Sequence, residues 1–155
     1  MGQENMTFRF AQKEDAALIL HFIRELAKYE KRPDQVFATE EMITEWLFEK
    51  ERAEAFFLVV DGKEIGYALF FHNFSTFSGR GGIYLEDLYV DPAFRGRGYG
   101  KASLQQLARM SEAATGWNGP VWTGTSPAWT FTSHSVRIPK RAVSLSVWKG
   151  MRSTS

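Results

Sequence analysis

The chain has no cysteine among its 155 residues, and this absence removes several classes of chemistry. Without thiols there is no disulfide framework, no thiolate zinc site and no cysteine nucleophile. No apolar run approaches the roughly 18 to 20 residues that a membrane span requires, and the N-terminus lacks a basic-then-apolar signal pattern. These absences predict a soluble, cytoplasmic protein with no membrane partner.

Acidic residues are missing from residues 113–155, which carry five Lys and Arg but no Asp or Glu. Residues 1–112 hold 14 Lys and Arg against 18 Asp and Glu, a net charge of −4. An acidic body lacks the basic face that nucleic-acid phosphates require, so no nucleic-acid partner is expected. The length predicts a single domain, with residues 1–5 as a leader, 6–112 as the body and 113–155 as an atypical tail.

The apolar periodicity of the body predicts a mixed α/β fold of the α+β kind, with the order β-α-α-β-β-β-α. Alternation at Phe8 and Phe10 indicates a strand, and apolar residues then recur every three or four positions as far as Tyr29, which indicates a helix. Asp61 and Gly62 separate two apolar runs and predict a tight hairpin. A further strand, GGIYLEDLYV, precedes a loop and the helix that begins KASLQQLARM.

The loop before that last helix, RGRGYGKA at residues 95–102, is rich in glycine and in basic residues. The first turn of a helix leaves N–H groups unpaired and carries a partial positive charge, so it attracts anions. Glycine lets the backbone close around such an anion, and Arg95, Arg97 and Lys101 add full charges. The pattern predicts a site for a pyrophosphate or another multiply charged group.

Two common phosphate-binding loops do not fit this spacing. A dinucleotide loop requires a third glycine three positions after the second, but Lys101 stands there when counted from Gly98. A nucleoside-triphosphate loop requires glycine where Arg95 stands, and Ser or Thr where Ala102 stands. A plain glycine-rich turn that caps a helix is the alternative interpretation.

The pattern Arg-x-x-Gly-x-Gly, formed by Arg95, Gly98 and Gly100, resembles the acetyl-CoA loop of the GNAT acetyltransferase superfamily. In addition, ELAKYE at 25–30 and YLEDLYV at 84–90 resemble the diamine (spermidine/spermine) N-acetyltransferase branch. The resemblance covers about residues 6–112. It implies the GNAT fold, acetyl-CoA as co-substrate, a small primary amine as acceptor, a homodimer and no metal, and the three histidines are too scattered to form a metal site.

The resemblance also implies roles for individual residues. Backbone N–H groups of the loop would hold the pyrophosphate, and a strand that splays from its neighbour would expose main-chain groups to the thioester and the pantetheine. The implied cofactor positions are Leu88, Val90, Arg95, Gly96, Arg97, Gly98, Gly100 and Lys101.

Acetyl transfer requires a neutral amine, whereas an alkyl amine has a pKa near ~10 and is mostly protonated at neutral pH. Glu86 is the family-matched general base that would remove this proton, directly or through water. On a straight strand Asp87 would point to the opposite face, so only one of the pair could face the cleft. Glu25, Tyr29 and Glu30 at the first helix, together with Asp87, are predicted to attract the cationic substrate. Solvated carboxylates or structural ion pairs are the alternatives.

Residues 113–155 do not match the expected end of the family. The branch leads us to expect a strand and a helix whose tyrosine protonates the departing thiolate, and neither motif is present. Codons read one base out of frame from Gly116 can restore both motifs, so we interpret the tail as a frame-shifted text that lacks the family's last strands. The alternative is a genuine ending that packs, because RAVSLSVWKG alternates like a strand.

Three functions follow from these observations. The first is an acetyl-CoA-dependent N-acetyltransferase for a polyamine, diamine or other small primary amine. The second is a catalytically silent CoA-binding or dimer-forming domain, because the catalytic tyrosine is missing. The third, a binder of nucleotide phosphates, ranks last because the loop spacings do not fit it.

Overall fold

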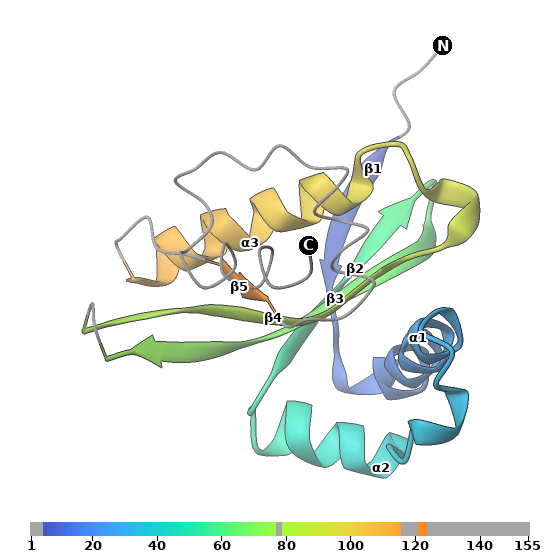
Figure 1. The fold of residues 1–155 in the computed structure, drawn as a ribbon, viewed down its shortest axis with the longest axis horizontal. Coiled ribbons are helices and arrows are strands. Elements are labelled where there is room, and N and C mark those ends of the chain that lie inside the picture. Colours follow the sequence, from blue (N-terminus) through green and yellow to red (C-terminus); the bar gives the residue numbers. More distant parts are fainter. Residues whose placement is uncertain (1–4, 77–78, 116–120, 124–155) are drawn as a thin grey trace.

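A computed structural model describes residues 5–76, 79–115 and 121–123. One five-stranded sheet has the order β1-β2-β3-β4-β5, so neighbours in the sheet are also consecutive in the chain (Figure 1). The strands are β1 Met6–Phe10, β2 Glu54–Val60, β3 Lys63–Ser75, β4 Arg80–Val90 and β5 Val121–Thr123. The first four strands pair antiparallel, and β5 pairs parallel to β4.

Three α-helices accompany the sheet: α1 Ala16–Tyr29, α2 Glu40–Ile43 and α3 Tyr99–Thr115. A π-helix over Thr44–Glu49 continues α2, and single 3-10 turns lie at Lys13–Asp15, Pro33–Gln35 and Pro92–Phe94. The order β1-α1-α2-β2-β3-β4-α3 confirms the predicted element order and the mixed α/β class. The π-helical continuation was not predicted.

The sheet separates two hydrophobic layers, with α3 on one face and α1 and α2 on the other (Figure 1). Consecutive residues of β2 enter different layers, because strand side chains alternate: Phe56 packs in the cluster with α3, and Phe57 in the cluster with α1. Both rings are fully buried. Two covered faces explain why the sequence of this strand is continuously apolar rather than alternating.

The predicted hairpin joins β2 to β3 through a two-residue turn. Asp61 has a φ of 51° and Gly62 a φ of 79°, and the flanking residues Val60 and Lys63 pair directly. Two successive positive φ values are what a tight hairpin of this kind requires, because they match the twist of the strands. The Asp-Gly signal is confirmed.

A β-bulge interrupts β4 at Glu86. Leu69 pairs with Asp87, but the next residue of β3, Phe70, pairs with Leu85, so Glu86 is the extra residue. As a result Leu85 and Leu88 both pack in the cluster with α3, although they are three positions apart. The strand is therefore not straight, so the simple alternation assumed for Glu86 and Asp87 does not apply at this position.

A short strand follows α3. Residues Val121–Thr123 pair with Ile83, Tyr84 and Leu85 of β4, so the expectation that no family-like strand follows this helix is corrected for these residues. Residues 116–120 and 124–155 of the tail lie outside the described residues, so the interpretation of the tail as a frame-shifted text stays a prediction. No helix in the described ranges is long and apolar enough to cross a membrane.

Candidate active site

The loop from β4 to α3 has a backbone that two glycines make possible. Gly96 has a φ of 78° and Gly98 a φ of 85°, a region that other residues enter only with strain. A Cβ added at either position would meet no atom within 4 Å. The conformation of the main chain, and not crowding, therefore requires glycine at these two positions.

The first turn of α3 lies directly after this loop. The first intrahelical hydrogen bond joins the N–H of Ala102 to the carbonyl of Gly98 at 3.0 Å. The N–H groups of Gly100 and Lys101 precede it, in the part of a helix that has no internal acceptor. Tyr99 is buried against the sheet, and the Oγ of Ser103 donates to its carbonyl at 2.9 Å, which fixes the start of the helix.

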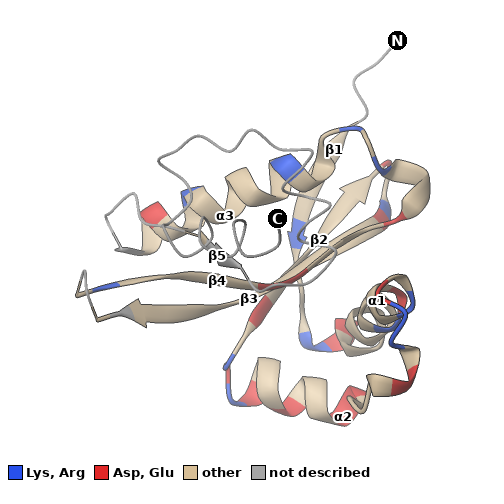
Figure 2. Cartoon of the chain, in the orientation of Figure 1, with Lys and Arg blue, Asp and Glu red and all other residues tan. Residues whose placement is uncertain are grey.

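Arg95 points back toward α1 and connects two groups of predicted residues. Its Nε donates to the carbonyl of Val90 at 2.8 Å, and its guanidinium lies 4.5 Å from the ring centre of Tyr29 and 5.3 Å from that of Tyr89. Arg97 is exposed, with its guanidinium 5.3 Å from the ring of Phe94. Figure 2 shows the basic residues of this loop beside the start of α3.

The second half of β4 lies beyond its pairing with β5. In the described residues that pairing ends at Leu85, whereas Leu88 and Val90 continue the strand with their side chains buried toward α3. Any contact of these two residues with a cofactor would therefore use the main chain. The carbonyl of Val90 is already an acceptor for Arg95.

Glu86 and Asp87 differ sharply in their surroundings. Glu86 is exposed at the bulge, whereas Asp87 is partly buried and accepts a hydrogen bond of 2.5 Å from the hydroxyl of Tyr67. Burial raises the pKa of Asp87 to about 6; the bond from Tyr67 acts in the opposite direction, and the charges of Glu86 and Glu30 add to the rise. The bulge thus places two adjacent carboxylates in different surroundings.

The α1 residues contribute unequally to this region. Glu25 forms an ion pair with Lys28 at 2.9 Å within the helix. This contact is the one expected if Glu25 belongs to a solvated helix face. Tyr29 is 39% exposed and lies under Arg95. The Oε1 atom of Glu30 is buried and has no hydrogen-bond partner among the described residues.

Sequence reasoning missed Tyr67 and Tyr89. Tyr67 is fully buried, and burial is the main reason that its pKa lies well above 10, followed by the charge of Asp87. Its ring is stacked on Phe22, with centroids 5.5 Å apart and planes at 10°. In the sequence both tyrosines stand in apolar strand runs, so nothing distinguished their hydroxyls from ordinary core packing.

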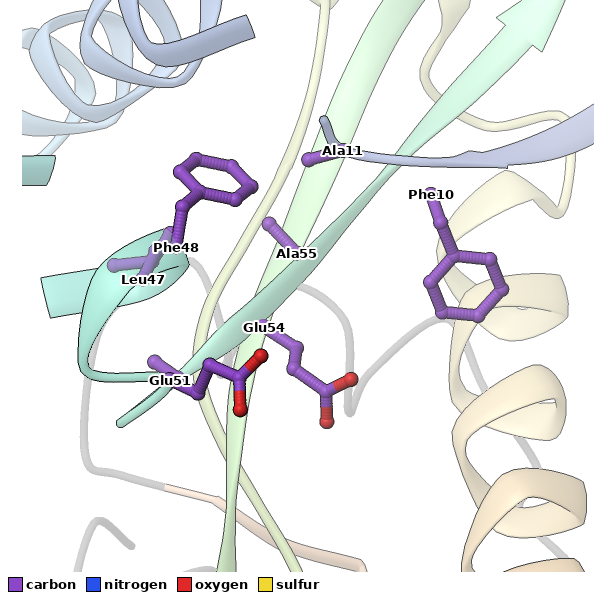
Figure 3. A pocket seen from close by; sticks show the side chains of 8 residues that line it. Phe10, Ala11, Leu47, Phe48, Glu51, Glu54 and Ala55 are labelled. Carbon is purple, nitrogen blue, oxygen red and sulfur yellow. The ribbon is translucent and has the colours of Figure 1, made fainter. Parts of the chain in front are cut away.

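A hollow of about 440 Å³ lies elsewhere, between the end of β1, the π-helix and the start of β2. Figure 3 shows Phe10 and Phe48 on its walls and the carboxylates of Glu51 and Glu54 beside it. Glu54 also lies 3.0 Å from His72. No predicted site residue lines this hollow, and the described residues contain no cluster of side chains suited to a metal.

The chain is similar in sequence to curated proteins of known activity. Two curated relatives, both thialysine N-epsilon-acetyltransferases, are 36% identical: one from Bos taurus over 120 residues and one from Sus scrofa over 124 residues. These matches cover 66% and 69% of this chain. The chain spans 65% of the length of the Bos taurus relative and 68% of that of the Sus scrofa relative.

Solved structures share the fold at low sequence identity. A predicted acetyltransferase with acetyl-CoA from Clostridium acetobutylicum has a TM-score of 0.67 at 14% identity, covering 93% of this chain and 97% of its own. A ribosomal-protein-alanine N-acetyltransferase from Brucella melitensis biovar Abortus 2308 has a TM-score of 0.64 at 19% identity, covering 87% and 93%. At such identities the likeness shows the fold alone.

The family assignment rests on the sequence of most of the domain. The profile of the acetyltransferase (GNAT) family matches residues 19–127, from α1 to just beyond β5. That range includes the glycine-rich loop and the acidic pair, on which the predicted resemblance depended. The chain therefore belongs to the GNAT acetyltransferase family.

Proposed function

We propose that the chain is an acetyl-CoA-dependent N-acetyltransferase acting on a primary amine of a polyamine, a diamine or a similar small molecule. The observation that carries the proposal is the turn at Gly96 and Gly98, which leads directly into the N-terminus of α3. The relatives named for acetylation of thialysine support an amine acceptor, and a fold neighbour described with acetyl-CoA supports the co-substrate.

The cofactor proposal relies mainly on the main chain. The N–H groups of Gly96, Gly98, Gly100 and Lys101 gather where the helix dipole favours a pyrophosphate, and no side chain fills the space beside the two positive-φ glycines. Arg97 adds a positive charge at the surface of the loop. Main-chain groups of Leu88 and Val90 would lie along the pantetheine. When bound, acetyl-CoA supplies an activated acyl group.

Glu86 is the proposed general base. As the ammonium loses its proton to Glu86, directly or through one water, the amine nitrogen becomes able to attack the acyl carbon. The new N–C bond would replace the C–S bond: the thiolate would leave with the electron pair of that bond, and the nitrogen would give up its second proton to the thiolate or to water. Exposure at the bulge allows Glu86 to pass its proton on to solvent.

Glu25, Tyr29 and Asp87 form the proposed surroundings of the cationic acceptor. Negative charge on α1 and β4 would raise the local concentration of an ammonium ion, and the ring of Tyr29 adds a face for its alkyl chain. The proposal further includes a homodimer in the cytoplasm, a compartment that suits a chain without cysteine. Analytical ultracentrifugation tests the dimer.

An acetyl-transfer assay with isotope-labelled acetyl-CoA and a panel of mono-, di- and polyamines tests the function. The expected result is acetylation that depends on both substrates. Calorimetry run in parallel measures binding of acetyl-CoA. Binding without transfer to any amine would favour the catalytically silent domain instead, and loss of both would remove the proposal.

A further inference from the structure

The hydroxyl of Tyr67 makes a contact that has no role in the proposed reaction. It lies in the layer between the sheet and α1, where the whole tyrosine side chain is buried. Its proton is directed at Oδ2 of Asp87, 2.5 Å away. Within the described part of the chain, Oδ2 is the only atom of the Asp87 carboxylate that takes part in a hydrogen bond, so Oδ1 is left for another partner.

The bulge at Glu86 makes this contact possible. Tyr67 pairs across the sheet with Tyr89, and Asp87 lies two residues before Tyr89 on the same face. Such diagonal neighbours are within reach of long side chains. Because the bulge exchanges the faces of β4, Asp87 shares a face with Tyr67, whereas Leu85 before the bulge points to α3.

The tyrosine is itself held in place. Phe22 of α1 stacks on its ring, and its remaining surface is enclosed by the hydrophobic cluster beneath α1. A hydroxyl on so rigid a ring cannot follow a moving carboxylate. It therefore limits Asp87 to orientations in which Oδ2 meets the hydroxyl.

The carboxylate has no cation of its own among the described residues. Tyr67 approaches it from β3, Glu86 from β4 and Glu30 from the residue that follows α1, and the two glutamates add negative charge. Arg95, which also points toward α1, contacts Val90 and the rings of Tyr29 and Tyr89. A partly buried carboxylate surrounded in this way gains from an incoming positive charge.

We propose that Tyr67 is a positioning residue for the amine acceptor: by holding Oδ2 of Asp87, it presents Oδ1 to the ammonium group. This role rests on the proposed N-acetyltransferase function. It does not place Tyr67 in contact with the reacting atoms. A merely structural tyrosine would stabilise the fold without affecting how the amine binds.

The test is the variant Tyr67→Phe, which keeps the buried ring and removes only the hydroxyl. The carboxyl carbon of Asp87, labelled with ¹³C and assigned with Asp87→Asn, is titrated by NMR. Loss of a hydrogen bond to a charged group is expected to raise the pKa of Asp87 further by about one to two pH units. This measurement needs no enzymatic activity.

Steady-state kinetics give the second measurement. Tyr67→Phe is expected to raise KM for the amine about tenfold at pH 7, while kcat and KM for acetyl-CoA stay close to those of the wild type. In a background of Asp87→Asn the same change is expected to have little further effect, because the partner charge is gone. Tyr84→Phe is the matched control, since its ring stacks on Phe71 and its hydroxyl does not contact Asp87.

The outcomes separate the two proposals. An active wild type whose Tyr67→Phe variant shows an unchanged Asp87 pKa, or an unchanged KM for the amine, would overturn the positioning role and leave the proposed function standing. A folded wild type that transfers acetyl to no amine would overturn the proposed function, and the positioning role with it. An Asp87 shift together with an amine-specific rise in KM supports the inference.

Discussion

The loop that leads into α3 and the acidic face beneath α1 are built on opposite principles. The loop relies on main-chain geometry, with positive φ at Gly96 and Gly98 and side chains that point outward or away. The acidic face, formed by Glu30, Glu86 and Asp87, relies on side-chain functional groups that a rigid core holds in place. The hydrogen bond from the buried Tyr67 to Asp87 is the example. The loop should therefore be sensitive to backbone changes, and the face to the loss of single atoms.

The largest effect is expected from Glu86→Gln, which removes the proposed base and keeps the shape. We expect kcat to fall by about 100-fold or more, while acetyl-CoA binding measured by calorimetry stays the same. Because Glu86 is exposed, the free energy of unfolding should change by less than about 0.5 kcal/mol. Glu41→Gln on α2 is the control, and an active Glu86→Gln enzyme would rule out the base.

The next effect is a gain of stability from Asp87→Asn. The folded-state pKa of about 6 lies above the ordinary value of 3.8, so the folded protein holds this proton more tightly than the unfolded chain. Stability should therefore fall as pH rises from about 4 to 6 and stay lower above that range. The variant removes this cost, so its free energy of unfolding at pH 7 should be about 2 kcal/mol higher than that of the wild type.

Urea unfolding at pH 7 and pH 4 checks this prediction. At pH 4 the two proteins should have nearly equal stability, since Asp87 is then protonated in the folded state. The same variant should bind the amine more weakly, so it separates stability from function. If the wild type and the variant were equally stable at both pH values, the charge on Asp87 would not destabilise the folded protein, and the prediction would be wrong.

A smaller effect is expected from Gly98→Ala, which tests the loop through its backbone. A φ of 85° is strained for alanine, and relaxation would misplace the first N–H groups of α3. We expect acetyl-CoA binding to weaken about tenfold, with roughly 1 kcal/mol lost in stability. Gly79→Ala is a matched control, because Gly79 has a φ of 69° but lies near the far hairpin; it should lose stability without losing cofactor affinity.

The smallest effect is expected from Lys28→Ala, which breaks the exposed pair with Glu25. Surface pairs of this spacing contribute about 0.5 kcal/mol or less. Thermal melts should therefore hardly change. A fall in KM for a diamine would contradict this expectation. It would mean that Glu25, once released from Lys28, binds the acceptor rather than forming part of a solvated helix face.

The sequence predicts the elements of this fold well, because each has a local signal. The Asp61-Gly62 turn and the amphipathic stripe of α1 depend on residues a few positions apart. The bulge at Glu86 has a weaker signal. Leu85 and Leu88 are both apolar and lie three positions apart, so a regular strand would point them to opposite faces of the sheet. Alternation over so short a run does not reveal an inserted residue.

The site was harder to predict than the fold, since its contacts join distant segments. The loop glycines were recognised because their spacing matches a known motif, and the φ values near 80° at Gly96 and Gly98 strongly favour glycine. Tyr67 was missed because Tyr and Phe are equivalent in an apolar strand, and only the register with β4 brings its hydroxyl to Asp87. The stacking of Arg95 on Tyr29 depends in the same way on how α1 crosses the sheet.

The strand order has a consequence for how the chain reaches its native state. Two hairpins join β2, β3 and β4, and each pairs neighbours that are adjacent in the chain, so little entropy is lost in closing them. In contrast, β1 must pair with β2 across the segment that holds α1 and α2, and β5 must pair with β4 across α3. We therefore expect the meander to form early, with the acidic pair already in register before the last strand docks.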